Sequence, residues 1–389
     1  MVEVTRSNWF NRLGKSVVGI IIGSVLFFGS FVLLYWNEGR VDLSKVAKTA
    51  IEVDAIKNVG ADHDKPVRLS GEATSSEVIG DDLILIPGKY LYVNRKAEVY
   101  AWTERKESET KKDTVGGGET TTTHYYYEKL WVNQAENDGN FNSSEKHDYE
   151  NKHNERIDNT KALQRVAESG SKQVETIIMG HYTMNTSNLI FPSPQEVTNL
   201  EGKLDLSKLN SYGKEIKSKY LYVRKASGTT GDQVGDERMS FSVVNYPFKG
   251  CAFGKLDGTE LKIYNVDIAM KNKATLFHLF DSDCESAITI LYQTFQFWLW
   301  FCRMAGFLMM FIGLMLVFDL ISTVLDIIGI IGDISRFLIN TILFVLALSL
   351  SIITIVVSAI VHNLIVLIVT LLGGGIIALI LIQKKKKIE

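Results

Sequence analysis

Long apolar runs occupy both ends of the 389-residue chain, and a polar region separates them. Residues 16–36 carry no charge, and 21 helical residues are enough to cross a hydrocarbon core of about 30 Å. Three further runs lie near the C-terminus: residues 298–318, with the single charge Arg303, and the uncharged residues 337–361 and 364–382. The pattern predicts an α+β membrane protein, in which one N-terminal and three C-terminal transmembrane helices flank a large β-rich domain at residues 37–297.

Short charged segments bound these spans and predict their orientation. They are residues 1–15 with three basic side chains, a linker at residues 319–336, and a basic tail at residues 383–389. Basic flanks stay on the cytosolic side of a membrane, so we expect both termini there and the β-rich domain in the lumen. The first run is too long for the core of a cleaved signal peptide. Tyr35 and Trp36 also occupy positions where small cleavage-site residues are required, so a membrane anchor is favoured.

Strand patterns dominate the region between the spans. Residues 81–104 and 120–133 are rich in β-branched and aromatic side chains, and the charged segment between them ends in three glycines. These features predict a long antiparallel hairpin with a solvated tip. Polar composition predicts an exposed loop at residues 133–155, helical spacing predicts a short helix at residues 41–56, and a turn at residues 234–238 precedes a predicted strand.

Residues with catalytic or metal-binding chemistry form no recognisable motif. The chain lacks a G-x-S-x-G elbow, a Walker phosphate loop and a paired-histidine zinc motif. His147 and His153 stand outside any dense cluster of cysteine and histidine, which favours solvated loop histidines over metal ligands. We therefore expect no enzyme activity, catalytic residue, cofactor or metal. The near-neutral net charge of −2 points to no particular partner, and no nucleic-acid partner is expected.

Charged side chains beside the apolar runs are more informative. Asp319, Asp326 and Asp333 recur at intervals of seven residues, so on one continuous helix they would form a polar stripe. Such a stripe suits an ion path or a docking face, and together with Arg303 it supports the alternative of a channel or transporter component. The favoured interpretation is a cytosolic interfacial segment whose carboxylates face water, with Arg303 extending to the lipid headgroups.

Two kinds of covalent modification are suggested in the lumenal region. Cys251 and Cys284 lie where a disulfide is permitted, although their spacing leaves pairing open. Asn142 and Asn185 begin N-glycosylation sequons. Both modifications depend on the predicted orientation.

The basic tail carries a targeting pattern. Lys386 and Lys387 are the fourth and third residues from the C-terminus, which matches a dilysine retrieval signal of the endoplasmic reticulum. A basic stop attracted to anionic membrane lipids is the alternative, and both functions are compatible.

The order of these features resembles the transmembrane protein 43 (LUMA) family. The resemblance begins at Asn37-Glu38-Gly39-Arg40, directly after the first span, and ends at the dilysine tail. The matching residues between them include Tyr100, Trp102, Trp131, Asn142, Gly235, Asp236, Arg238 and Arg303. The ordered combination covers nearly the whole chain.

This resemblance implies a non-enzymatic multi-pass scaffold of the endoplasmic reticulum membrane and the inner nuclear membrane, which organises complexes and maintains nuclear envelope structure. It implies homo-oligomers and, where the organism has them, lamins and emerin as partners; in a prokaryote the site would be the plasma membrane. The chain departs from the family in its shorter N-terminus and in its cysteines. The hairpin around residues 98–132 and the strand at residues 234–244 are candidate binding surfaces. Asn37-Glu38-Gly39-Arg40 is expected to be a helix exit or docking element rather than a catalytic pair.

Overall fold

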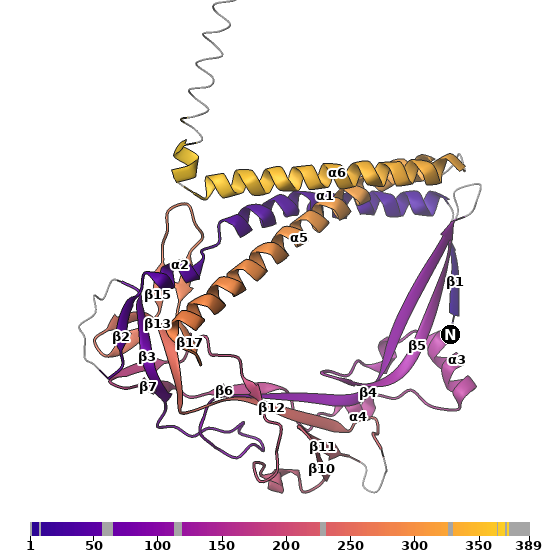
Figure 1. The fold of residues 1–389 in the computed structure, drawn as a ribbon. Coiled ribbons are helices and arrows are strands. Elements are labelled where there is room, and N and C mark those ends of the chain that lie inside the picture. Colours follow the sequence, from indigo (N-terminus) through magenta and orange to yellow (C-terminus); the bar gives the residue numbers. More distant parts are fainter. Residues whose placement is uncertain are drawn as a thin grey trace, which may run out of the picture.

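The structure, a computed structural model, is an α+β protein in which three long helices carry a domain of β-sheets (Figure 1). It describes residues 2–7, 9–56, 65–112, 119–225, 231–325, 330–363, 365–369 and 372. Within these ranges, one N-terminal and two C-terminal helices are apolar and long enough to cross a membrane, and the β-rich region lies between them in the sequence. The predicted fold class is confirmed. The predicted fourth span at residues 364–382 lies largely outside the described residues.

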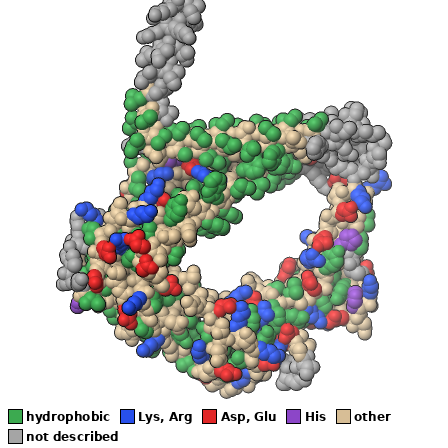
Figure 2. Space-filling model, viewed as in Figure 1, with side chains coloured by type: hydrophobic (Ala, Val, Ile, Leu, Met, Phe, Trp, Pro, Cys, Tyr) green, Lys and Arg blue, Asp and Glu red, His purple; other side chains and the backbone are tan. Residues whose placement is uncertain are grey.

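Three long helices pack into a bundle. They are α1 (Trp9–Glu38), α5 (Cys284–Leu325) and α6 (Ile330–Val361). α1 and α5 are antiparallel, with Gly23 against Gly313 and the C-terminal end of α1 beside the middle of α5. α6 contacts both, and the rings of Phe307 and Phe344 lie 5.4 Å apart between α5 and α6. Apolar side chains cover the visible surface of these helices, whereas charged side chains gather on the β-rich domain (Figure 2).

α1 and α5 approach closely because glycines face each other. A Cβ on Gly23 would lie 2.7 Å from the carbonyl oxygen of Gly313, and a Cβ on Gly313 would lie 2.7 Å from the carbonyl oxygen of Gly23. Inside a bilayer apolar side chains are already in an apolar solvent, so helices associate through close packing of small residues. Gly306 extends this contact by accommodating the fully buried Leu34.

The aspartate stripe of the alternative interpretation requires one continuous helix, which the described residues do not form. Asp319 belongs to α5 and Asp333 to α6, while Asp326 lies outside the described residues. Because α5 and α6 are separate helices, the seven-residue spacing of these positions does not continue along one helix. Most of the predicted linker at residues 319–336 is helical and forms the ends of α5 and α6.

The first sheet has eight strands, in the order β1-β5-β4-β12-β11-β10, with β6 beside β4 and β9 beside β12. Its strands are β1 (Val2–Ser7), β4 (Tyr90–Lys112), β5 (Glu119–Val132), β6 (Gly170–Gln173), β9 (Gln195–Glu196), β10 (Gly213–Lys217), β11 (Tyr220–Arg224) and β12 (Glu237–Asn245). β4 and β5 confirm the predicted hairpin, and β12 confirms the predicted strand. Along β12, alternation buries Met239 and Phe241 and leaves Arg238 partly exposed on the other face.

The second sheet has seven strands and curves on itself. They are β2 (Ile51–Asp54), β3 (Val67–Thr74), β7 (Thr176–Met179), β8 (Tyr182–Asn185), β13 (Phe248–Asp257), β14 (Glu260–Lys262) and β17 (His278–Phe280). Since β3 pairs with both β13 and β7, the strands β13, β14, β8, β7 and β3 form a closed ring. A separate two-stranded sheet consists of β15 (Tyr264–Val266) and β16 (Ala274–Leu276).

Two segments differ from the sequence prediction, and the described part of the domain contains three short helices. They are α2 (Leu43–Lys48), α3 (Ser143–His153) and α4 (Thr160–Leu163), with single 3-10 turns at Asp138–Asn140 and Leu206–Leu209. The expected loop at residues 133–155 contains α3, whose first turn Asn142 caps by accepting a hydrogen bond from the backbone N–H of Glu145. The expected helix at residues 41–56 ends early, and β2 follows it.

A main apolar core holds the domain together, and a second one attaches it to the helices. Buried side chains of both large sheets form the main core. A second core lies where α2, β13, β15, β16 and the beginning of α5 meet. In this second core Cys251 of β13 and Cys284 of α5 form a disulfide, with their Cα atoms 5.1 Å apart. The domain is thereby linked covalently to the start of a membrane helix.

β1 contacts the far end of the hairpin. It pairs antiparallel with β5, from Val2 opposite His124 to Ser7 opposite Glu119. These residues belong to the predicted cytosolic N-terminus, in which no strand was expected. The 30 residues of α1, about 45 Å of helix, separate β1 from the rest of the domain. The hairpin and the helices therefore enclose the opening visible in Figure 2.

We predict that Gly23→Ala destabilises the bundle more than Gly29→Ala. A Cβ on Gly29 would meet only the flexible end of Met309, at 3.5 Å, whereas a Cβ on Gly23 would meet helix backbone. Overpacking of this kind costs about 1–3 kcal/mol, so the thermal midpoint of the purified chain in detergent, followed by tryptophan fluorescence, should fall for Gly23→Ala. Equal midpoints for the two variants would contradict the close contact.

Candidate functional site

The motif residues of the sequence gather in three places. They are the exit of α1, the outer face of the first sheet with the loop behind it, and the base of the hairpin. The exit of α1 holds Asn37, Glu38, Gly39, Arg40 and Arg303. The outer face holds Tyr100, Trp131 and Arg238, the loop behind it holds Gly235 and Asp236, and the base of the hairpin holds Trp102 and Asn142. At the first place, side chains 265 positions apart in the sequence are in direct contact.

A buried ion pair joins α1 to α5 at the edge of the bundle. Arg303 Nε donates to Glu38 Oε1 at 2.8 Å, and Arg303 Nη2 donates to Glu38 Oε2 at 3.0 Å. The Glu38 side chain is 6% exposed and that of Arg303 is 20% exposed. Two parallel charge-assisted hydrogen bonds fix both the distance and the rotation of one helix relative to the other. The expectation that Arg303 extends to the lipid headgroups left out this partner, whose carboxylate lies on the neighbouring helix.

The other residues at the exit of α1 have contacts of their own. Asn37 Nδ2 donates to the carbonyl oxygen of Leu299 at 3.0 Å. Gly39 leaves no room for a side chain, because a Cβ would lie 2.7 Å from His362 Nε2, just beyond the end of α6. The Arg40 guanidinium lies 5.8 Å from the centre of a tryptophan ring at the end of α1. The motif therefore joins three helices at one level.

A loop of the β-rich domain completes the same site. Asn272 donates from Nδ2 to the carbonyl oxygen of Trp36 at 2.9 Å, and from its backbone N–H to that of Gly39 at 2.8 Å. Lys271 Nζ donates to the carbonyl oxygen of Glu38 at 2.7 Å. The last carbonyl groups of a helix have no partner within the helix, and here the loop supplies donors to them. These contacts make the motif a helix exit that is locked to the domain.

An aromatic–arginine face covers the outside of the first sheet. It consists of Glu98, Tyr100, Trp131, Tyr220, Tyr222, Arg224 and Arg238. The Arg238 guanidinium lies 4.7 Å from the ring centre of Trp131 and 4.5 Å from that of Tyr220. Its Nε also donates to Glu98 Oε2 at 2.6 Å. Partial burial raises the pKa of Glu98, but hydrogen bonds from Lys96 and Arg238 outweigh it and hold that pKa below its usual value.

Behind this face, buried carboxylates anchor the neighbouring loops. Gly235 has a φ of +97°, and a Cβ there would lie 2.7 Å from a side-chain atom of α4. Asp236 is 1% exposed and accepts hydrogen bonds from two backbone N–H groups and from Arg224. Glu237 is fully buried and accepts from the backbone N–H of Val166 and of the following residue. These acids are occupied by structural hydrogen bonds, so they position loops rather than supply general acids.

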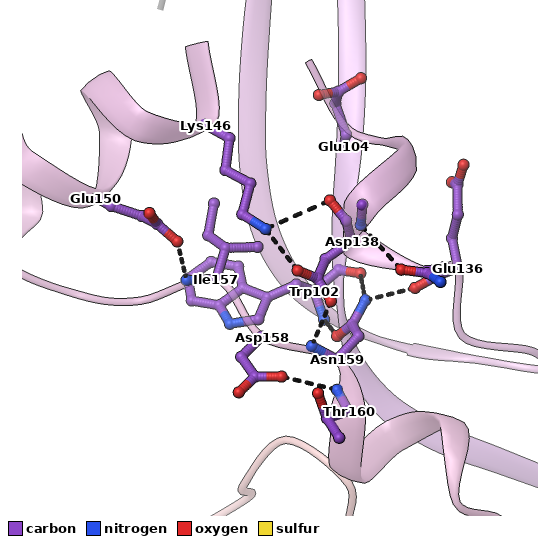
Figure 3. Close-up of polar contacts among 12 residues, drawn as sticks. Trp102, Glu104, Glu136, Asp138, Lys146, Glu150, Ile157, Asp158, Asn159 and Thr160 are labelled. Carbon is purple, nitrogen blue, oxygen red and sulfur yellow. Dashed lines mark hydrogen bonds and ion pairs between the residues drawn. The ribbon is translucent and has the colours of Figure 1, made fainter. Parts of the chain in front are cut away.

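At the base of the hairpin, the buried side-chain amide of Asn159 anchors its own segment to β4 (Figure 3). Asn159 Oδ1 accepts from the backbone N–H of Trp102, and its Nδ2 donates to the carbonyl oxygen of Trp102, both at 2.9 Å. The two bonds to Trp102 pair this side chain with β4 as a neighbouring strand would, and the same Nδ2 also donates to the carbonyl oxygen of Glu136. Partial burial raises the pKa of Asp138, but Lys146 and the backbone N–H of Asn159 donate to it and lower that pKa.

The modification and metal candidates differ in their surroundings. Asn185 is exposed at the end of β8, whereas Asn142 is partly buried and uses its side chain to cap α3. Among the described residues, no group of three His, Cys, Asp or Glu side chains is arranged to hold a metal ion. His153 stacks on Tyr149 at 4.1 Å. Lys386 and Lys387 lie outside the described residues.

A polar cleft of about 610 Å³ lies beside the base of the hairpin. Its lining includes Trp102, Lys129, Glu155, Lys161, Tyr212 and Lys225. Lys129 pairs with Glu155 and lies 4.6 Å from the ring centre of Trp102, and Lys225 pairs with Glu237 at 3.3 Å. Much of the charge in the cleft is therefore used within the protein.

Sequence reasoning missed two residues that complete these sites, Asn159 and Asn272, and it named Glu237 only as part of the motif at residues 234–238, without a role of its own. Asn159 and Asn272 stand in no motif, and their partners are 57 and 236 residues away. For Glu237 a signal existed, because strand alternation places it on the inward face with Met239 and Phe241. An inward carboxylate indicates a buried anchor.

Comparison with known proteins gives one consistent match. The sequence model of a family described as "Transmembrane protein 43" matches residues 99–364. "Transmembrane protein 43" of Homo sapiens is 24% identical over 368 residues, covering 90% of this chain and 86% of the relative. The protein of that name from Rattus norvegicus is 22% identical over 378 residues, covering 91% and 88%. No solved structure matches the chain significantly.

We predict that removing one member of the ion pair destabilises the chain more than removing both. Glu38→Gln leaves the Arg303 charge partly buried without a counterion, which should cost about 3–5 kcal/mol, and adding Arg303→Met should recover part of that loss. Thermal unfolding of the purified chain in detergent measures both effects.

The matched control is the exposed pair of Lys172 and Asp82, whose side chains are 40% and 72% exposed. Asp82→Asn should change the free energy of unfolding by less than about 1 kcal/mol. If the double variant Glu38→Gln with Arg303→Met is no more stable than Glu38→Gln alone, the two charges are not coupled.

Proposed function

The chain belongs to the transmembrane protein 43 family, and from this premise we propose that it is a non-enzymatic scaffold of the endoplasmic reticulum membrane and the inner nuclear membrane. It is a membrane protein with three candidate spans among its described residues. In this proposal the β-rich domain faces the lumen or perinuclear space, where it presents its surface to partner proteins and helps to maintain nuclear envelope structure.

The observation that carries the proposal is the firm attachment of the domain to the bundle. The pair of Glu38 and Arg303 fixes α1 to α5, and Asn272 ties the domain to the end of α1. The disulfide of Cys251 and Cys284 ties the domain to the start of α5. A scaffold requires a surface held in constant relation to the membrane, and these contacts supply it.

The same elements support the proposed orientation. Three basic residues precede the first apolar run, which favours a cytosolic N-terminus. A structural disulfide persists in an oxidising compartment such as the endoplasmic reticulum lumen, which is where the domain would then lie. In a prokaryote the equivalent compartment would be outside the plasma membrane.

The position of β1 conflicts with this orientation. If the N-terminus is cytosolic and the β-rich domain is lumenal, β1 cannot stay paired with β5 as it is in the structure. Its Val2 and Val4 side chains remain 49% and 63% exposed, so six residue pairs contribute only a few kcal/mol through their hydrogen bonds. The three long helices expose many large apolar side chains, and moving these from water into lipid gains on the order of tens of kcal/mol. We therefore propose that membrane insertion dominates and that β1 leaves β5 when α1 spans the bilayer.

The alternative of a channel or transporter component has weaker support. The centre of the bundle is a cluster of buried apolar side chains: Leu34, Met310, Leu314, Leu343 and Ala347. The hydroxyl groups of Ser30 and Thr354 donate to carbonyl oxygens of their own helices. These local hydrogen bonds serve helix structure and packing, which a scaffold also needs.

The proposed partners are further copies of the chain and, where the organism has them, lamins and emerin. The hairpin offers a surface for association, since Tyr126 and Leu130 of β5 are 40% and 44% exposed. Large aromatic and apolar side chains that remain exposed are common contributors to protein interfaces.

In a eukaryotic cell, lumenal placement predicts a glycan on Asn185 but not on Asn142. Asn185 is exposed, whereas Asn142 is partly buried. The glycan should be sensitive to endoglycosidase H and absent from Asn185→Gln, while Asn142→Gln leaves the band unchanged. Replacing Lys386 and Lys387 with Ser should yield resistant glycans if the tail retrieves the protein. A glycan on a sequon added ahead of Arg6, with none at Asn185, would reverse the orientation.

A scaffold role predicts that surface substitutions alter neighbours without unfolding the chain. A biotin ligase inserted between Lys112 and Glu119 should label nuclear-envelope and reticulum proteins, and Tyr126→Asp with Leu130→Asp should reduce that labelling severalfold. Ile190→Asp, at another exposed apolar side chain, is the control. A labelled set that is unchanged by the double substitution would exclude this surface. Labelling of surface-membrane proteins alone would argue against the proposed location.

A further inference from the structure

The loop between β15 and β16, residues Asp267–Lys273, is held at the level where α1 leaves the membrane. Asn272 bonds to the carbonyl oxygens of Trp36 and Gly39, and Lys271 bonds to that of Glu38. Because these groups are the last turn of a membrane helix, the loop has a fixed position relative to the bilayer whichever compartment it faces. Figure 1 shows it rising from the β-rich domain toward the end of α6.

Aromatic side chains locate the bilayer surface at this level. Trp36 on α1 and Trp298 on α5 are 50% and 45% exposed near the ends of their apolar segments. Tryptophan is enriched at the headgroup region, where its ring is amphipathic in the same way as its surroundings. A loop bonded to the carbonyl oxygen of Trp36 is therefore within reach of the headgroups and of the adjoining acyl chains.

The loop itself presents the residues expected of a membrane contact. Ile268 and Met270 are 44% and 43% exposed at its tip, and Met270 has a φ of +66°, which is rare for a residue other than glycine. Lys273 is exposed at its base, beside a small cavity of about 380 Å³ whose lining also includes Asp267 and Thr275. The two apolar side chains lie at the tip and the cation lies at the base. This order matches a leaflet, in which the acyl chains lie deeper than the phosphates.

We propose that this loop enters the leaflet that faces the β-rich domain. Ile268 and Met270 lie at the boundary of the acyl chains, and Lys273 contacts a lipid phosphate. The loop then acts as a third membrane contact beside the ends of α1 and α5, and it prevents the domain from tilting about them. This lipid contact depends on α1 spanning a membrane and is independent of any scaffold role.

Depth-dependent quenching of a probe on the loop tests the proposal. The full chain with Cys302→Ser and Met270→Cys is labelled with NBD and reconstituted into phosphatidylcholine–phosphatidylserine vesicles. A nitroxide at acyl carbon 5 should reduce the emission by about half, and Ile268→Asp should weaken this quenching. A probe at Lys273→Cys should instead be quenched more by a headgroup nitroxide. Leu163→Cys, 46% exposed on α4, is the matched control and should be quenched only by aqueous iodide.

Three results would overturn the proposal. A Met270 probe quenched by iodide as strongly as the Leu163 probe would place the loop in water. A Met270 probe shielded from both iodide and lipid nitroxides would mean that protein, such as a second copy of the chain, covers the tip. Equal depth for the Met270 and Lys273 probes would exclude insertion of the tip.

Discussion

The pairing of Glu38 with Arg303 is the constraint on which the rest of the molecule depends. Charges at the edge of an apolar bundle are stable only when they are paired, so this contact admits one rotation and one register of α1 against α5. The contact of Gly23 with Gly313 fixes a second point farther along the same two helices. Since the β-rich domain lies between α1 and α5 in the sequence, fixing these helices also fixes both ends of the domain.

Buried charges that are fully paired also recur within the β-rich domain. Asp81 is 3% exposed in its side chain, pairs with Arg95 at 2.5 Å, and accepts from the backbone N–H groups of three successive residues. Asp236 and Glu237 anchor loops in the same manner. Buried carboxylates with full sets of donors hold irregular segments against sheets, because leaving such a charge unpaired is costly. These buried polar residues therefore serve to fix the geometry of the loops that they contact.

Sequence patterns predicted the elements better than their contacts. The apolar runs, the hairpin of β4 and β5 and the strand β12 follow from period and composition, which are local properties. α3 was missed because a helix that is polar all around leaves no apolar stripe to detect. Asp319 and Asp333 appeared to share a face only under the assumption of one helix, and the division into α5 and α6 removes that basis.

The sequence by itself determined that this is a membrane protein with a large β-rich domain, and its ordered motifs identified the family. Those conclusions rest on hydrophobic length and on residue order, which need no knowledge of distance. Only the tertiary structure decided that Glu38 meets Arg303, that Cys251 reaches Cys284, and that Asn272 closes the end of α1. These contacts join residues from 33 to 265 positions apart, and nothing local in the chain specifies them. They arise when helix packing and sheet pairing bring the segments together.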